Sequence, residues 1–172
     1  MRGRAAAWLL WAALAAAPAC ARSGAIALPA PGAELFSPSR RCYVKVLEDP
    51  SDRTLRARLY ARERLVGDVK GAREMAWIGE ALVFAVSPAF ARPGIYVWDC
   101  PKPIVRRVVK PSRSSLAHPG GTDFYQLVEI DGDVLYYAHA PDVDSPSLER
   151  DLERGIETLR LRPFRPKLSM NE

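Results

Sequence analysis

Short runs in which hydrophobic and polar residues alternate follow one another along the chain from Cys42 onward. The runs are rich in Val, Ile, Leu and Tyr, and clusters of Gly, Pro, Asp and Ser separate them. A period of two residues is typical of β-strands with one buried face, and such clusters are typical of turns. We therefore expect an all-β fold of antiparallel sheets. The predicted strands are Tyr43–Leu47, Leu55–Tyr60, Leu65–Val69, Glu74–Trp77, Leu82–Val86, Ile95–Trp98, Ile104–Val109, Phe124–Ile130, Val134–His139 and Ile156–Leu161.

One part of this pattern occurs twice. Residues Gly79–Pro88 align without gaps on Gly132–Pro141, 53 positions later, and four positions are identical. Gly94-Ile95 recurs as Gly155-Ile156, 61 positions later, so the second copy holds an 8-residue insertion. A unit of three or four strands that recurs at about 50 residues is typical of propeller blades. Two unrelated hairpins would align in the same way, because a Gly and an acidic residue commonly precede the second strand of a hairpin.

The insertion carries the signals of a short helix. Ser145 suits the N-cap, Pro146 suits the first helical position and Gly155 suits the end. Leu148 and Leu152 are four residues apart and would share one face of this helix. A recognition feature and a solvated connection held by two leucines both fit this pattern. The candidate partner-binding residues are Leu148, Leu152, Arg150 and Arg154.

The middle of the chain resembles one repeat of a known family. Trp77 stands on a first strand, Leu82-Val83-Phe84 on a second, Ile95-Tyr96-Val97-Trp98-Asp99 on a third, and Arg106-Arg107-Val108-Val109 closes the unit. This order resembles a repeat of the TolB-type, WD40-like β-propellers, although Ile78-Gly79-Glu80 replaces that family's Ser-Pro-Asp-Gly turn. The resemblance implies blade-like sheets. About 120 folded residues hold two to three blades, whereas a closed propeller has 4–8, so a partial propeller and a β-sandwich both remain open.

The start of the chain predicts a secretory signal peptide over residues 1–21. Arg2 and Arg4 precede a stretch without charge from Ala5 to Ala21, and Pro18 ends its apolar core. A cationic start, an apolar stretch of about 7–15 residues and small residues at the exit are typical of such signals. The apolar stretch is shorter than the roughly 20 residues of a membrane span. We therefore expect export to the periplasm or the extracellular space.

Two kinds of processing fit the end of this signal. Ala19-Cys20-Ala21 has the A-x-A form that signal peptidase accepts, which would give a mature chain from Arg22. Ala17-Pro18-Ala19-Cys20 resembles a degenerate lipobox of bacterial lipoproteins, in which Cys20 would carry the lipid. We favour simple cleavage, and a membrane contact is expected only if Cys20 is lipidated.

The chain has three cysteines, and either kind of processing removes Cys20 from the free thiols. Cys42 and Cys100 then remain in an oxidising compartment, where disulfides persist. Two buried, unpaired thiols are the alternative to a disulfide between them. A C-x-x-C pair is absent, which argues against thiol–disulfide exchange.

Composition excludes several classes of protein. The chain has 172 residues, of which 48% are hydrophobic and 26% charged, so a disordered or collagen-like chain is excluded. The net charge of +5 falls to +3 when Arg2 and Arg4 leave with the signal. A net charge this close to zero gives little reason to expect a nucleic acid as partner. One cluster of basic residues is most simply interpreted as the solvated end of a strand. It consists of Arg106, Arg107, Lys110 and Arg113.

Candidate chemistry is sparse. His118 lies in a polar loop with Ser115 and Asp123 nearby in sequence, which raises the possibility of a Ser/His/Asp hydrolase set, although the chain has no nucleophile elbow. His139 lies on a predicted strand, and we interpret it as structural. Zinc ligands at short spacing, a calcium loop and a phosphate-binding Gly-rich loop are all missing, so we expect neither metal nor cofactor.

These observations favour an exported interaction or scaffold module that binds a protein partner or a second copy of itself. A small secreted hydrolase that uses His118 and a lipoprotein subunit anchored at Cys20 are the two alternatives. The expected parts of the chain are a signal peptide (1–21), a Pro/Ala-rich linker (22–41), a β-repeat domain (42–163) and a tail (164–172).

Overall fold

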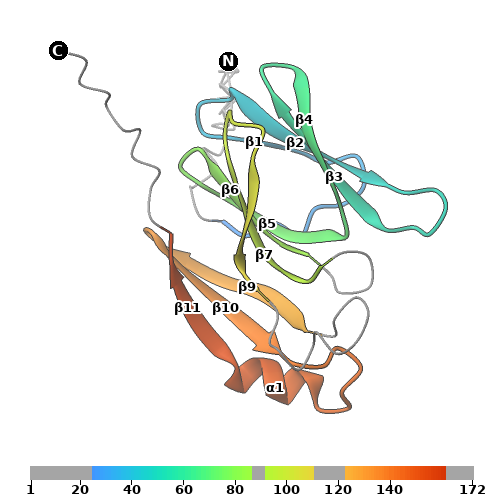
Figure 1. Cartoon of the computed structure of the whole chain (residues 1–172), viewed down its shortest axis with the longest axis vertical. Coiled ribbons are helices and arrows are strands. Elements are labelled where there is room, and N and C mark those ends of the chain that lie inside the picture. The colour runs from blue at the N-terminus through green and yellow to red at the C-terminus, as the bar shows by residue number, and fades with distance from the viewer. Residues whose placement is uncertain (1–24, 87–91, 111–122, 162–172) are drawn as a thin grey trace, which may run out of the picture.

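Three antiparallel sheets and one short helix make up the computed structural model, which describes residues 25–86, 92–110 and 123–161 (Figure 1). In every sheet the strands follow one another in chain order as a meander. The first sheet holds β1 (Glu34–Phe36), β2 (Cys42–Glu48), β3 (Leu55–Ala61) and β4 (Arg64–Lys70). The second holds β5 (Ala72–Ile78), β6 (Ala81–Val86), β7 (Gly94–Asp99) and β8 (Val105–Val109). The third holds β9 (Phe124–Asp131), β10 (Val134–Ala140) and β11 (Ile156–Arg160), with α1 (Leu148–Arg154) between its last two strands.

The prediction of an all-β antiparallel fold with one helical insertion is confirmed. Each of the ten strands expected from the alternating pattern has its counterpart among β2 to β11. The helix α1 begins at Leu148, two residues after the position that Pro146 suggests, and its N-cap is Ser147 rather than the expected Ser145. The Ser147 hydroxyl does not cap the backbone, and the Ser145 and Ser147 hydroxyls instead donate to the Asp151 carboxylate. The helix ends at Gly155 as expected.

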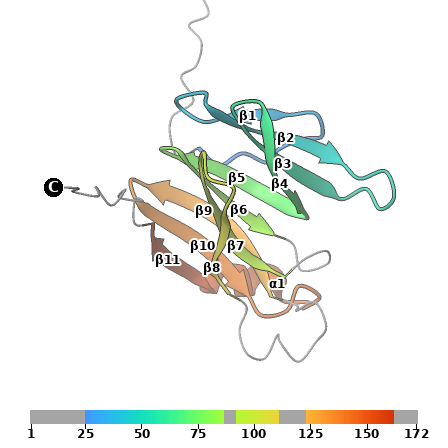
Figure 2. The ribbon, with the colours of Figure 1, turned by 45° about the horizontal axis from the view of Figure 1, so that its top comes forward.

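The second sheet lies between the other two and is buried on both faces (Figure 2). On β6, Leu82, Phe84 and Val86 pack toward the first sheet, whereas Val83 and Ala85 pack toward the third. A strand with two buried faces needs apolar residues at every position rather than at alternate ones. This explains why residues 81–86 form a continuous apolar run in the sequence.

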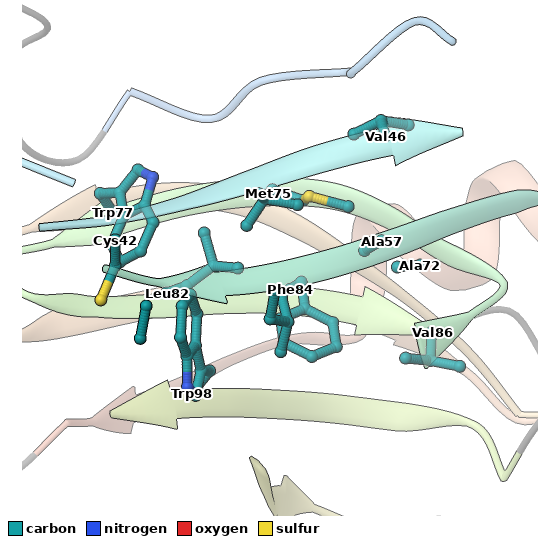
Figure 3. Close-up of a cluster of buried hydrophobic side chains, with 13 residues drawn as sticks. Cys42, Val46, Ala57, Ala72, Met75, Trp77, Leu82, Phe84, Val86 and Trp98 are labelled. Carbon is teal, nitrogen blue, oxygen red and sulfur yellow. The ribbon is translucent and has the colours of Figure 1, made fainter. Parts of the chain in front are cut away.

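The core between the first and second sheets is built around two tryptophans (Figure 3). The Trp77 and Trp98 rings lie 5.8 Å apart between centroids, and both side chains are nearly or fully buried. Their indole N–H groups do not lose hydrogen bonds on burial, because Trp77 donates to the Leu35 carbonyl and Trp98 to the Lys102 carbonyl. The two indoles therefore bring apolar area into the core at little polar cost.

A disulfide joins Cys42 to Cys100, with a Cα–Cα distance of 6.3 Å. Cys42 begins β2 in the first sheet, and Cys100 directly follows β7 in the second. The bond therefore connects two sheets across a separation of 58 residues. The expected pairing of these two cysteines is confirmed.

Part of the segment predicted as a linker belongs to the sheets. Ala27 exchanges two backbone hydrogen bonds with Met75 of β5, at 2.7 and 2.9 Å. Residues 34–36 form β1 at the edge of the first sheet. A three-residue strand flanked by prolines gives no periodic signal, so the alternating pattern alone does not reveal it.

Two-residue turns connect the first two strands of the second and third sheets. Gly79 begins the turn between Ile78 and Ala81 with φ of 56°, and Gly132 begins the turn between Asp131 and Val134 with φ of 58°. Glycine is favoured there because a side chain disfavours positive φ. The first aligned positions of the two similar segments thus have the same local structure, while a repeat in the sense of a known family stays a prediction.

Candidate functional site

Asp123 is the one member of the suggested hydrolase set that lies among the described residues; Ser115 and His118, like Cys20, lie outside them. Asp123 directly precedes β9 and is fully buried. Its Oδ1 lies 2.5 Å from Nε2 of His139 on β10. The structure therefore brings Asp123 to a histidine for which the sequence suggested only a structural role.

Aromatic and acidic side chains surround His139 on the inner face of the third sheet. Its ring stacks on Tyr125 of β9, with centroids 4.8 Å apart, and its Nδ1 lies 3.8 Å from Oε1 of Glu157 on β11. The Tyr137 hydroxyl donates to the Glu157 carboxylate at 2.6 Å. Burial raises the pKa of the Tyr125 and Tyr137 phenols. A phenol with a raised pKa is a poor nucleophile at neutral pH, so we interpret the Tyr137–Glu157 hydrogen bond and the His139–Tyr125 stacking as structural contacts that join three strands.

The helix α1 presents the predicted partner-binding side chains near one end of β11. It packs against β10, with Leu148 and Leu152 partly covered, and none of its residues is buried. Arg150 and Arg154 are exposed. The helix therefore offers a polar surface with two half-covered leucines, which is compatible with both of the roles expected from the sequence.

A groove of about 500 Å³ lies at the other end of β11, between the second and third sheets. Its apolar lining comes from both sheets, and arginines and aspartates lie at its mouth. The apolar lining residues are Ile78, Ala81, Val97, Val108, Leu159 and Leu161. The charged residues are Asp99, Arg106, Arg107, Asp133 and Arg160.

The charges at the groove mouth are only partly neutralised by one another. The Arg106 guanidinium donates to the Asp99 carboxylate at 2.8 and 3.1 Å. Arg160 lies 3.7 Å from Asp133, and both side chains are at least half exposed. Three arginines against two aspartates leave an excess of one positive charge on the lining. The groove therefore combines an apolar floor with a basic mouth.

Strand edges flank this groove on two sides. β8 is the last strand of the second sheet, and β11 is the last strand of the third. Among the described residues, neither strand has a second neighbour in its sheet. The sequence pattern places Arg106 and Arg107 at a solvated strand end and gives no connection with Leu159 or Arg160. Only the stacking of the sheets brings these residues together, and the alternating pattern carries no information on stacking.

A larger hollow of about 710 Å³ lies over the first sheet, beside Asp49, Arg56 and Arg58. Its arginines already form ion pairs, because Arg56 contacts Asp49 at 3.3 Å and Asp68 at 3.2 Å, and Arg58 contacts Asp68 at 3.5 Å. A ligand would have to compete with these pairs. The groove between β8 and β11 is therefore the better candidate for a binding site.

Neither a metal centre nor a membrane helix is found in the described part of the chain. No three His, Cys, Asp or Glu side chains within residues 25–86, 92–110 and 123–161 are grouped to hold a metal ion. The same residues include no helix long and apolar enough to cross a bilayer.

Comparisons with known proteins were made at three levels. No family model, no curated protein and no solved structure matches the chain.

Proposed function

We propose that the chain is an exported interaction module that binds a protein partner in the bacterial envelope. The observation that carries this proposal is the groove between β8 and β11, with its apolar lining and arginine mouth. Apolar centres surrounded by polar residues, with arginine enriched, are typical of protein interfaces. The Cys42–Cys100 disulfide supports the export part of the proposal, because disulfides persist in oxidising compartments.

The anchor is a separate question from the binding role. Cleavage before Arg22 would release the domain, whereas a lipid on Cys20 would hold it at a membrane surface. The mass of the mature N-terminus distinguishes the two, because a lipidated Cys20 carries the added mass of its acyl chains and a plain Arg22 start does not. The groove would serve a partner in both cases.

Site-specific photocrosslinking in intact cells tests the proposal. A photoreactive amino acid is placed at Arg160, which is exposed at the groove mouth, and in a matched variant at Arg64, which is exposed on the first sheet. We expect the Arg160 position to form an adduct with one defined envelope or secreted protein and the Arg64 position to form none with that protein. The same adduct from both positions, or none from either, would contradict the proposal.

The captured protein is then purified and titrated against groove variants. Val108→Asp puts a carboxylate into the apolar lining, and Val128→Asp puts the same change on β9, the opposite edge strand of the third sheet, where the side chain is exposed. We expect Val108→Asp to weaken binding at least about tenfold, on the scale of an interface hot spot, and Val128→Asp to leave it unchanged. Equal affinity of the two variants would show that the partner binds elsewhere.

A further inference from the structure

The backbone of β11 presents alternate residues to an open edge. The N–H of His139 on β10 donates to the Gly155 carbonyl, and the N–H of Leu161 donates to the Asp133 carbonyl. In an antiparallel ladder, every second residue of a strand exchanges its hydrogen bonds with the same neighbour. The odd-numbered residues of 155–161 therefore face β10. The N–H and C=O groups of Ile156, Thr158 and Arg160 point to the opposite side, where the described residues hold no further strand.

The side chains of β11 separate in the same alternating way. Leu159, like Leu161 just beyond the strand, points toward the second sheet and lines the groove. Ile156, Thr158 and Arg160 lie on the other face of the strand and are exposed. The open backbone edge and the apolar groove therefore lie along the same strand. A chain added to this edge would place alternate side chains over the groove where it passes Leu159 and Leu161.

The positive charge near the groove favours acidic side chains in such a chain. The excess positive charge on the groove lining comes from Arg106 and Arg107 on β8 and Arg160 on β11. A second copy that offered β8 or β11 would bring these arginines against their like, which is unfavourable for strands placed side by side. Acidic side chains on the outer face of an added strand would instead complement Arg160 and compete with its loose contact to Asp133.

We infer that the protein partner binds by adding an extended strand to the open edge of β11. This strand alternates apolar side chains, which enter the groove beside Val108 and Leu159, with acidic side chains, which lie on the other face of the sheet beside Arg160. Backbone hydrogen bonds supply affinity and the alternate side chains supply selectivity, as in other cases of strand addition. The inference rests on the proposed function and specifies the binding mode and the chemistry of the partner segment.

A synthetic peptide in which Glu and Val alternate over seven residues is the probe. It is titrated into the full chain with the disulfide formed, and amide hydrogen exchange is followed by NMR. We expect exchange at Ile156, Thr158 and Arg160 to slow at least tenfold, because these N–H groups gain an acceptor. The odd-numbered amides should change little, since they already bond β10. A peptide with Lys in place of Glu should bind at least tenfold more weakly.

Two variants of Thr158 distinguish the contribution of its outward backbone N–H from that of its side chain. Thr158→Pro removes an outward N–H without removing a bond to β10, whereas Thr158→Ala keeps the N–H and removes the side chain. We expect the proline variant to lose at least tenfold in affinity for the Glu/Val peptide and the alanine variant to bind like the natural chain. Far-ultraviolet circular dichroism and thermal melting verify that both variants keep the fold.

Several results would overturn the inference. These are no binding of the Glu/Val peptide at millimolar concentration, binding without slower exchange at the three even-numbered amides, and equal affinity for the Lys peptide. Concentration-dependent self-association that protects the same amides without peptide would replace the partner strand by a second copy. If the crosslinked natural partner binds Thr158→Pro normally but not Val108→Asp, strand addition is wrong while the proposed function stands. If no partner is crosslinked at Arg160, the proposed function itself fails.

Discussion

The buried carboxylate of Glu74 on β5 accepts a hydrogen bond from the backbone N–H of Leu127 on β9. This contact connects the edge of the second sheet to the third. Burial raises the pKa of the Glu74 carboxyl above its ordinary value of 4.5, and the neighbouring Arg73 guanidinium, 3.7 Å away, only partly opposes this. The Oε2 atom has no hydrogen-bond partner among the described residues. The ionised form of Glu74 therefore destabilises the folded state.

Glu74→Gln should raise the free energy of unfolding at pH 7 by about 1 kcal/mol, because the amide is neutral and still accepts from Leu127. A carboxyl whose pKa is raised by folding holds its proton more tightly in the folded state. Its stabilising effect is complete below pH 4.5 and is lost as the pH rises through the raised value. The advantage of the Gln variant should therefore grow with pH in urea unfolding from pH 4 to 8. Glu129→Gln, exposed on β9, is the control, and an advantage that does not change with pH would contradict the argument.

Reduction of the Cys42–Cys100 disulfide should lower the free energy of unfolding by about 4 kcal/mol, the loop-entropy value for a separation of 58 residues. The loss arises because the reduced unfolded chain gains conformational freedom. Urea unfolding with and without a reducing agent measures the difference. The double variant Cys42→Ser, Cys100→Ser should unfold like the reduced chain and should not respond to the reagent. A response in that variant would point to another cause.

Asp52 should titrate far below an ordinary aspartate. A hydrogen bond from the Lys70 ammonium, supported by the Thr54 hydroxyl, lowers its pKa from 3.8 to about 2. The contribution of this pair to stability is present above pH 3.8 and is lost as the pH falls toward 2. NMR titration of the Asp52 carboxyl measures the midpoint, and Lys70→Met should move it back toward 3.8. An unchanged midpoint in that variant would show that Lys70 is not the cause.

The alternating pattern predicts the strands well because most of them bury one face against a neighbouring sheet. Tyr43–Leu47 alternates for this reason, with Val44 and Val46 buried and Tyr43 and Lys45 partly exposed. The continuous apolar run at 81–86 is recognised as a strand by its length and its glycine turn, and the structure adds that both faces are buried. If residues 1–21 are a cleaved signal, as the sequence predicts, Cys42 with Cys100 is the one pairing left to expect, and the structure contains it. These features depend on local sequence patterns or on the number of cysteines, so one sequence suffices to predict them.

The candidate sites depend on contacts between sheets, which one sequence does not specify. His139 replaces a valine in the aligned segment, and this suggested a structural residue, but its position does not reveal that Asp123 lies 2.5 Å away. In the same way, Arg106 and Leu159 are 53 positions apart and meet only because the second and third sheets stack. Co-variation between such positions is the signal that could have found these pairs.

Gly155 tests how closely the start of β11 must approach β10. A Cβ at this position would lie 2.2 Å from the His139 carbonyl oxygen and 2.9 Å from that of Asp151, both of which are backbone atoms that cannot rotate away. Gly155→Ala should therefore lower the free energy of unfolding by about 2 to 3 kcal/mol, the upper part of the range for overpacking. It should also loosen the first residues of β11, which hydrogen exchange at Glu157 would report as faster exchange.

Gly132→Ala is the matched control for this change. A Cβ at Gly132 meets nothing within 4 Å, but φ is 58°, so the cost is the backbone preference alone, about 1 to 2 kcal/mol. This variant should leave exchange at Glu157 unchanged, because the turn lies at the other end of β10. If Gly155→Ala were no more destabilising than Gly132→Ala and left exchange at Glu157 unchanged, the close approach of β11 to β10 would not be needed.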